Sequence, residues 1–255
     1  MNWTPFDPNA VIKSPKEAIN VFDFEAACRV NVPPAHFGYM ISGVDGETTL
    51  RANRADFQKF QLLPRRLHDV SKVDMRVTLF GTTWDSPIYT CPIGGAMAYD
   101  PDGELAVSKA TRAGNHLQVL STHANTPIGE AIKARGAPVW FQLYPSNSWE
   151  IAKVLVKRAE DAGSPVVAVT VDSLGGRKQE PLERLRRIDT RTCSDCHDNS
   201  SQKASLRRKR NWEGIDVEAL GMKNISGPNL TWDFVKRLRD VTKMKVLLKG
   251  IVHPE

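Results

Sequence analysis

Apolar stretches rich in β-branched and aromatic residues recur along the last two thirds of the chain, and each predicts a buried strand. They cover residues 87–93, 116–122, 139–144, 166–172 and 245–251. The segments between them have helical periodicity, and in one of them a single face carries Ile151, Val154, Leu155 and Ala159. Nearly continuous apolar strands that alternate with helices predict a parallel sheet covered on both faces.

The spacing of these stretches suits repeated strand–helix units. Successive strands begin 29, 23 and 27 residues apart, which leaves room for one helix and two short loops. Gly114 and Gly163 follow predicted helix ends, and residues 147–150, Asn-Ser-Trp-Glu, predict a capping box. The last strand begins 79 residues after the fourth, and we expect the excess to be a mobile loop over residues 173–229.

Two architectures satisfy this pattern, a (β/α)₈ barrel and an open doubly wound sheet. The first strand is not followed by G-x-G-x-x-G, which weighs against a dinucleotide-binding open sheet. Polar residues stand at the C-terminal ends of the strands, where a barrel places its chemistry. We therefore expect an α/β chain of the (β/α)₈ TIM-barrel type that is incomplete, with five strands before residue 255.

The first 85 residues predict an N-terminal helical extension and a hairpin. After an irregular arm, helices are expected behind an Asp23 cap, over residues 35–42 and over residues 48–57, and a hairpin within 70–86. The predicted division of the chain is an extension over 1–85 and a partial barrel over 86–255.

Composition excludes several classes of protein. Of 255 residues, 41% are hydrophobic and 25% are charged, as in ordinary globular proteins. No apolar run reaches about 18 residues, so no membrane span is expected. The first residues show no secretory signal, and we expect a cytoplasmic protein. Four cysteines do not suggest a disulfide framework.

The net charge of +6 arises in one segment. Residues 173–212 hold 11 basic and 5 acidic side chains, which leaves the remainder neutral. We interpret this basicity as a solvated loop, with a nucleic-acid or membrane patch as the alternative. Nucleic acid is therefore not expected as a partner.

Polar side chains in the predicted strands are candidates for chemistry. Side chains alternate along a strand, so Gln142 shares one side with Tyr144, and Thr170 shares one side with Asp172. An unpaired buried amide costs about 1–3 kcal/mol, so Gln142 and Thr170 pair with neighbouring backbone or with a heteroaromatic ligand. Lys249 closes an apolar strand and either lies near an anionic ligand or reaches solvent.

The ends of the first two strands carry glycines and histidines. Gly94 and Gly95 are either an ordinary turn or a place where a flat ring approaches the backbone closely. His116 and His123 flank the second strand, and we expect them to be structural or exposed.

Five separated motifs occur in an order and at a spacing that are typical of one known family. They are GYMISG at 38–43, LPRRLHDV at 63–70, FQLY at 141–144, TVD at 170–172 and LKG at 248–250. Together they resemble the FMN-dependent 2-hydroxy-acid oxidases and dehydrogenases, such as glycolate oxidase, lactate oxidase and flavocytochrome b2. The resemblance extends from about residue 21 to the last residue, interrupted by the basic loop. It implies a (β/α)₈ barrel with FMN at the C-terminal ends of its strands.

The resemblance also implies which residues bind the cofactor. The backbone of Ile93 and Gly94 would meet the reactive edge of the flavin, and Ser121, Gln142 and Thr170 would hydrogen-bond its ring system.

Three further residues receive roles from the resemblance. Lys249 would lie beside flavin N1 and O2, where an ammonium stabilises the negative charge that develops on the ring. Tyr39 and Tyr144 would bind the carboxylate or hydroxyl of the substrate.

This sequence departs from the family at two places. The resemblance implies a substrate arginine after the TVD motif, where an ungapped alignment puts Gln179, preceded by Arg177 and Lys178. It also implies a catalytic histidine in a Ser-Asn-His-Gly-Gly motif on a sixth strand, followed by phosphate-binding strands, and these 255 residues contain neither. His253 follows Lys249 too closely to be that base. We therefore assign no catalytic residue in this chain and expect poor activity from it alone.

Residues 193–197, Cys-Ser-Asp-Cys-His, match the C-x-x-C-H spacing of covalent haem attachment. The polar surroundings supply no haem pocket, and a zinc site would need more ligands. We interpret Cys193 and Cys196 as a surface thiol pair. Metal and haem sites are the alternatives, and haem would imply a periplasmic protein.

The sequence thus predicts FMN-dependent oxidation of a small (S)-2-hydroxy acid, lactate or glycolate among the candidates, to the 2-oxo acid. Oxygen, a quinone or a cytochrome remains open as the electron acceptor, and a homo-oligomer remains open as the assembly. The alternatives are a catalytically silent flavin- or ligand-binding half-barrel and a haem-bearing or nucleic-acid-binding module.

Overall fold

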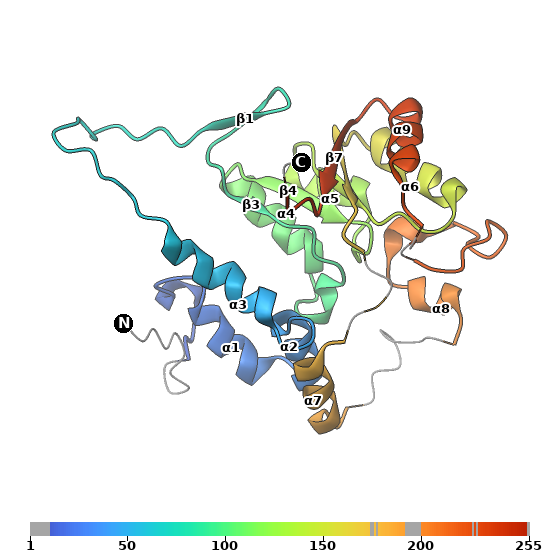
Figure 1. Ribbon diagram of the computed structural model, residues 1–255, viewed down its shortest axis with the longest axis horizontal. Helices are drawn as coiled ribbons and strands as arrows, with labels where there is room; N and C mark the ends of the chain where they lie inside the picture. Colours follow the sequence, from blue (N-terminus) through green and yellow to red (C-terminus); the bar gives the residue numbers. More distant parts are fainter. Residues whose placement is uncertain are drawn as a thin grey trace. The chain divides into compact units, whose positions relative to one another are not determined.

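The larger of the two sheets is parallel and has five strands, in the order β3-β4-β5-β6-β7 (Figure 1). The computed structural model describes residues 11–173, 176, 178–191, 200–225, 227 and 229–253. The strands are β3 (Tyr89–Thr90), β4 (Leu117–Ser121), β5 (Trp140–Leu143), β6 (Val166–Thr170) and β7 (Lys245–Lys249). All five predicted strands are confirmed. Neighbours in the sheet are neighbours along the chain, as in a (β/α)₈ barrel and unlike a doubly wound sheet, whose strand order reverses.

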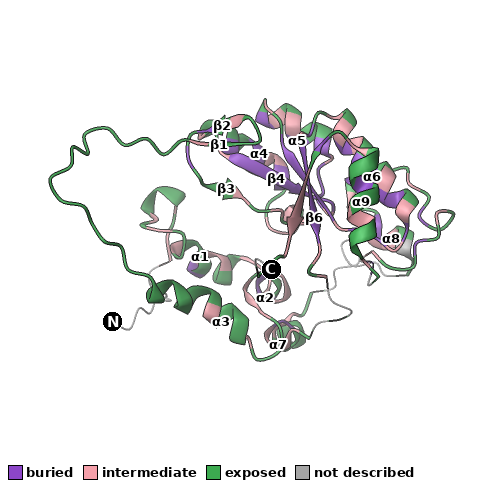
Figure 2. Ribbon diagram, turned by 45° about the horizontal axis from the view of Figure 1, so that its top comes forward, coloured by how far each residue is buried: buried purple, intermediate pink, exposed green. Residues whose placement is uncertain are grey.

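Helices connect the strands of the sheet. They are α4 (Gly103–Ala113), α5 (Ile128–Arg135), α6 (Trp149–Asp161) and α9 (Trp232–Val241). Every residue of β4, β5 and β6 is buried, whereas β7 is only partly buried (Figure 2). The middle of the sheet is therefore the part that the helices cover most completely.

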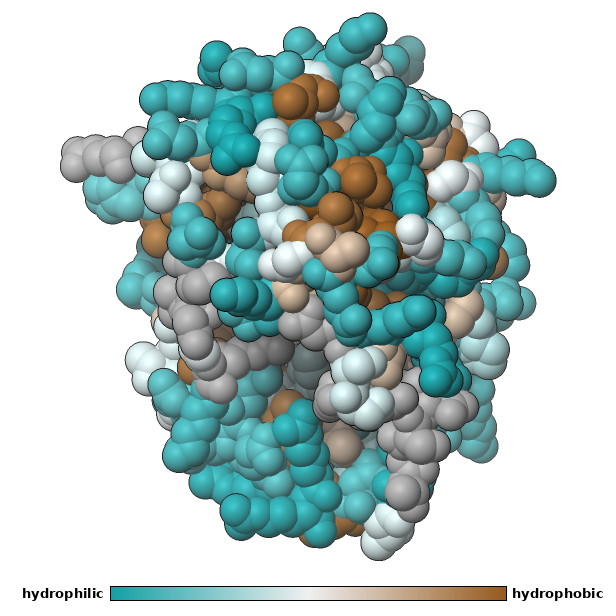
Figure 3. Space-filling view, turned by 90° about the vertical axis from the view of Figure 1, so that its right-hand side faces the viewer, coloured by the Kyte–Doolittle hydropathy of each residue, from teal (hydrophilic) through white to brown (hydrophobic). Residues whose placement is uncertain are grey.

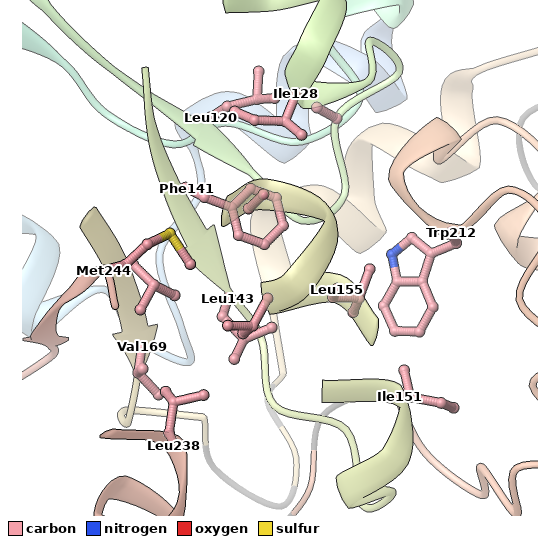
Figure 4. Packing of buried hydrophobic residues seen from close by; sticks show 14 of the residues in the cluster. Leu120, Ile128, Phe141, Leu143, Ile151, Leu155, Val169, Trp212, Leu238 and Met244 are labelled. Carbon is pink, nitrogen blue, oxygen red and sulfur yellow. The ribbon is translucent and has the colours of Figure 1, made fainter. Parts of the chain in front are cut away.

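The hydrophobic core lies between these strands and helices (Figure 4). Its largest members include Leu120, Ile128, Phe141, Leu143, Ile151, Leu155, Trp212, Leu238 and Met244. The predicted inner face of α6 is confirmed for Ile151, Leu155 and Ala159, which are fully buried. Val154 is 39% exposed, because it lies at the margin of that face.

Helix boundaries follow the predicted stop signals better than the start signals. Gly114 and Gly163 do follow the ends of α4 and α6. The predicted capping box is wrong: the Ser148 hydroxyl donates to the Leu220 carbonyl at 2.7 Å and caps no α6 amide. The Asp23 cap is also wrong, since Asp23 is the first residue of α1 (Asp23–Asn31) and its carboxylate accepts from the preceding backbone amide of Ile19 at 2.7 Å.

The chain divides into two compact units, and the division differs from the predicted boundary at residue 85. Unit 1 consists of Met1–His68 and Gly176–Thr192, and unit 2 of Asp69–Gly175 and Cys193–Glu255. The predicted hairpin is present as β1 (Val77–Leu79) and β2 (Thr82–Trp84) and belongs to unit 2. The reason is that Trp84 is buried in a cluster with Leu117 and Trp140.

Unit 1 is helical. Its helices are α1, α2 (Pro34–Ile41), α3 (Thr48–Ala55) and α7 (Glu180–Ile188), so the three predicted N-terminal helices are present. A fourth helix joins them from a distant part of the sequence. The Cα of Gly38 in α2 approaches α7 so closely that a Cβ there would lie 2.8 Å from Leu185 Cδ1.

The sequence predicted one continuous loop over residues 173–229, and this prediction is wrong. Its described residues include α7, α8 (Gln202–Leu206) and a short 3-10 helix over Arg210–Trp212. Trp212, Val217 and Met222 are buried in the core of unit 2. Apolar side chains placed among the basic ones therefore anchor much of this segment.

Hydrophilic side chains cover most of the face shown in Figure 3, with smaller hydrophobic areas between them. Among the described residues, none of the helices has the length and apolar character that crossing a bilayer requires.

Candidate functional site

Four polar side chains that the sequence singled out lie at or next to the carboxyl ends of four consecutive strands of unit 2. The strand register pairs Ser121 with Gln142, and Thr170 with Lys249. Ser121, Gln142 and Thr170 are buried, and the Lys249 side chain is 38% exposed. The carboxyl ends of parallel strands thus bring two hydroxyls, an amide and an ammonium to one edge of the sheet.

One of the two polar atoms of the Gln142 side-chain amide has a hydrogen-bond partner among the described residues. Its Nε2 donates to Thr170 Oγ1 at 2.8 Å. Its Oε1 is buried and has no hydrogen-bond partner among the described residues. A buried acceptor without a donor costs about 1–3 kcal/mol, and a ligand N–H at this position would satisfy the oxygen.

Hydrogen bonds after β4 lock the ends of β4 and β5 together. Thr122 donates its hydroxyl proton to the Gln142 carbonyl and accepts from Tyr144 N at 2.9 Å. The Ser121 hydroxyl accepts from His123 N at 3.1 Å. These bonds fix the backbone on either side of Gln142, and with it the direction of the amide.

Lys249 is paired with a carboxylate just after the neighbouring strand β6. Its Nζ lies 3.7 Å from Asp172 Oδ2. Gly250, with φ +113°, makes this approach possible, because a Cβ there would lie 2.6 Å from Asp172 Cβ. The predicted alternatives for Lys249 were an anionic ligand or solvent, and the ammonium is partly accessible beside its carboxylate partner.

Close packing and backbone conformation account for the two glycines after β3. A Cβ on Gly94 would lie 2.9 Å from His123 Cβ, and Gly95 has a φ of +72° that favours glycine. Ile93 is 60% exposed. The contact of the Ile93 and Gly94 backbone with a flavin stays a prediction.

His123 lies among aromatic side chains at this edge. Its ring stacks on Tyr144 with 4.9 Å between centroids and lies 6.1 Å from the Trp212 ring. Burial, reinforced by the positive charge of Lys209, lowers the pKa of His123 to about 3. Its Nε2 is buried without a partner among the described residues. The sequence predicted a structural or exposed side chain for His123, which lies two residues after Ser121 among these aromatic rings.

The two tyrosines implied by the resemblance lie in different units. Tyr144 directly follows β5 in unit 2, and Tyr39 is an exposed residue of α2 in unit 1. Their joint contact with a substrate stays a prediction.

The remaining candidates of the basic segment are only partly described. Gln179 precedes α7 in unit 1 and donates to the Ser42 hydroxyl at 3.3 Å. Arg177 and the C-x-x-C-H residues 193–197 lie outside the described residues. Within the described part of the chain, no group of three or more His, Cys, Asp or Glu side chains could hold a metal ion.

Residues 28–255 match the family model of the FMN-dependent dehydrogenases. The chain belongs to this family. It is 35% identical over 238 residues to an L-lactate oxidase of Lysinibacillus sphaericus, which covers 91% of this chain and 61% of that protein. It is 31% identical over 249 residues to glycolate oxidase 3 of Arabidopsis thaliana, which covers 94% of this chain and 64% of that protein.

Solved structures agree with the FMN-dependent dehydrogenase assignment. A soluble mutant of the (S)-mandelate dehydrogenase from Pseudomonas putida superposes with a TM-score of 0.78 at 26% identity, over 91% of this chain and 64% of that chain. A flavocytochrome b2 mutant with pyruvate bound gives a TM-score of 0.77 at 25% identity, over 96% and 56%. This chain spans about three fifths of the length of such relatives. The predicted family and the incomplete barrel fold are confirmed.

Proposed function

We propose that the protein uses FMN to oxidise a small (S)-2-hydroxy acid to the 2-oxo acid. One observation carries the proposal: the buried Gln142 Oε1, at the carboxyl edge of the sheet in a member of an FMN-dependent family, has no donor among the described residues. A flavin ring presents an N–H between two carbonyl groups, which suits an acceptor flanked by hydroxyl donors. The residues present therefore fit the cofactor.

The two hydroxyls at this edge are prepared to donate. Thr170 Oγ1 accepts from Gln142 Nε2, and Ser121 Oγ accepts from His123 N. Each hydroxyl accepts one hydrogen bond from the protein, and its own proton can be donated to a ligand acceptor. Gln142 would then accept from the ring N–H, while Ser121 and Thr170 donate to ring acceptors.

Lys249 supplies the positive charge of the site. FMN, when bound, accepts the hydride equivalent that the substrate carbon loses. The Lys249 ammonium would offset the negative charge that this transfer brings to the ring, and Asp172 orients the ammonium from 3.7 Å. Tyr144 and Tyr39 would hydrogen-bond the carboxylate or hydroxyl of the substrate. We assign no general base to the described residues.

The experiment is a visible absorption spectrum of the purified protein with FMN, before and after anaerobic addition of lactate or glycolate. We expect a bound flavin spectrum that bleaches with one of the acids. Gln142→Met should weaken FMN binding about tenfold or more, which corresponds to about 1.4 kcal/mol. The matched control is Gln118→Met, an equally buried glutamine on β4 that pairs with Thr111 and should leave FMN affinity unchanged.

A protein that ignores added FMN would overturn the proposal. FMN binding without reduction by any 2-hydroxy acid would contradict the oxidation and favour the silent flavin-binding alternative. After reduction, air is admitted: rapid return of the flavin spectrum indicates oxygen as the acceptor, and slow return excludes oxygen and leaves a quinone or a cytochrome to be tested.

A further inference from the structure

Part of the basic segment is fastened across the carboxyl end of β4. We call residues 205–213 the strap. Asn125 Nδ2 donates to the Arg208 carbonyl at 2.8 Å, and Trp212 Nε1 donates to the Thr122 carbonyl at 3.1 Å. The Asn211 side chain is buried and accepts from Ile128 N at 3.0 Å. The strap is therefore an ordered part of unit 2 that reaches the loop between β4 and α5.

Lys209 in the middle of the strap is a half-buried cation that forms no ion pair with any described residue. Its Nζ donates to the Ser205 carbonyl at 2.7 Å, a neutral acceptor that leaves two ammonium protons. The next residue, Arg210, contrasts with it, because its guanidinium pairs with Glu130 at 3.0 Å. Burial lowers the pKa of Lys209, as expected of an ammonium that has lost water without gaining a carboxylate.

The strap holds the Lys209 backbone against Trp212, whose ring neighbours that of His123. Trp212 N donates to the Lys209 carbonyl at 2.8 Å, and the Trp212 ring is 6.1 Å from that of His123. The charge of Lys209 also contributes to the lowered pKa of His123. The strap thus brings a half-buried cation to the end of the sheet that holds the His123 ring, whose Nε2 has no partner among the described residues, and the Tyr144 phenol.

The charge and hydrogen-bonding groups of this cluster favour binding of an anion. Charges in a half-buried site interact more strongly than in water, so a desolvated ammonium gains most from a carboxylate partner. A pKa of about 3 makes His123 neutral at pH 7, so it adds a hydrogen bond rather than a second charge. It also makes His123 a weak base, far from the pKa near 7 that general-base catalysis favours. The cluster is therefore suited to recognition.

On the basis of the proposed function, we propose that Lys209, with His123, selects 2-hydroxy acids that carry a second carboxylate on the side chain. Lactate and glycolate have one carboxylate, which the proposed site assigns to the tyrosines. A 2-hydroxy dicarboxylic acid has a second one for the ammonium of Lys209. The strap would then determine substrate class, and Lys209 is its specificity-determining residue.

The test is calorimetric titration of the purified, FMN-treated protein with L-malate and with (S)-2-hydroxybutyrate, which has the same carbon number and one carboxylate. The wild-type protein should bind malate at least about tenfold more tightly. Lys209→Met keeps the aliphatic stem, loses the charge and should abolish this preference, and Lys209→Arg should retain it. Lys203→Met, in α8 with an exposed side chain, is the matched control and should behave as wild type.

Equal affinity for the two acids, no binding of either, or an unchanged preference in Lys209→Met would each overturn the inference. The titration is made without oxygen and compares affinities rather than flavin reduction, so its failure is distinct from failure of the proposed function, which shows as absence of FMN uptake or of flavin bleaching. Folding of each variant is checked by its thermal transition. Should Lys209→Met unfold, the preference of Lys209→Gln decides the question in the same way.

Discussion

At the scale of single residues, buried polar groups that have hydrogen-bond partners help to interpret those that lack them among the described residues. The buried Glu104 carboxylate accepts from three backbone amides, those of Ala96, Asn125 and Thr126, at 3.1–3.2 Å. Glu104 is therefore a structural group, and the protein itself supplies its hydrogen-bond donors. Gln142 Oε1 and His123 Nε2 are equally enclosed and lack such donors or acceptors among the described residues. This contrast is why we assign ligand contacts to the latter two.

His123 should make stability depend on pH. Its native pKa of about 3 lies below the unfolded value of about 6.5, so the unfolded state binds more protons between these two pH values. The stabilisation is fully present above pH 6.5 and is lost as the pH falls. We expect a loss of about 2 kcal/mol in the free energy of unfolding between pH 7 and pH 5.

Urea denaturation at both pH values, on wild type and on His123→Gln, measures this effect. The variant lacks the titrating ring but keeps the other histidines, so the difference between the two pH slopes isolates His123. Identical slopes would show that the ring is not held neutral in the native state.

Lys249 should act on the rate of flavin reduction. Lys249→Met removes the ammonium at the carboxyl end of β7, and loss of one such electrostatic contact typically costs about 10²–10³-fold in rate. Lys245→Met alters the opposite end of the same strand and serves as the control. Anaerobic stopped-flow absorbance with lactate or glycolate measures both. An unchanged rate in Lys249→Met would remove this residue from the site.

At the scale of elements, close approach between helices depends on small residues. In unit 1, α2 and α7 come from distant parts of the sequence and meet at Gly38, against Leu182 and Leu185. The hydrophobic periodicity of each helix alone does not predict this contact. The contact explains why part of the basic segment is helical and belongs with the N-terminal helices.

Gly38→Val should therefore destabilise unit 1. Its Cβ would meet Leu185 Cδ1 at 2.8 Å and Leu182 Cα at 3.3 Å, and such overpacking costs about 1–3 kcal/mol. Gly46→Val is the matched control, because nothing lies within 4 Å of a Cβ there. Thermal denaturation followed by far-ultraviolet circular dichroism compares the two. Equal transition temperatures would contradict the close packing of α2 on α7.

At the scale of the whole molecule, the two units differ in what they offer to a cofactor. The four polar residues near the carboxyl ends of the strands all belong to unit 2, and Tyr39, whose substrate role stays a prediction, belongs to unit 1. The assignment of FMN thus concerns the sheet of unit 2.

FMN should accordingly protect the two units unequally. A ligand at 100 times its Kd stabilises the unit that binds it by about 2.7 kcal/mol. Hydrogen exchange with and without FMN should show slower exchange for the amides of β4, β5, β6 and β7. Exchange in α1 and α3 should change little. Uniform slowing in both units, or none in the strands, would contradict binding at the sheet edge.

Much of this architecture follows from local pattern. The five strands appear in sequence because buried parallel strands are continuous apolar runs, and their polar last residues are visible in the same runs. The ends of α4 and α6 follow from Gly114 and Gly163. The capping roles of Asp23 and Ser148 were wrong, because a short polar side chain serves whichever backbone group lies nearest, and the sequence does not show which one that is.

The sequence by itself determined the strands, their parallel order, the family and the residues that end the strands. Each of these depends on residues close in the chain or on motifs that keep their spacing. Only the tertiary structure decided that Gln142 pairs with Thr170, that His123 stacks on Tyr144 and that the strap returns to β4. The Trp212 contact with Thr122 spans 90 positions, and Gln142 is 28 positions from Thr170. Such contacts arise from packing of separate elements, and no local propensity encodes them.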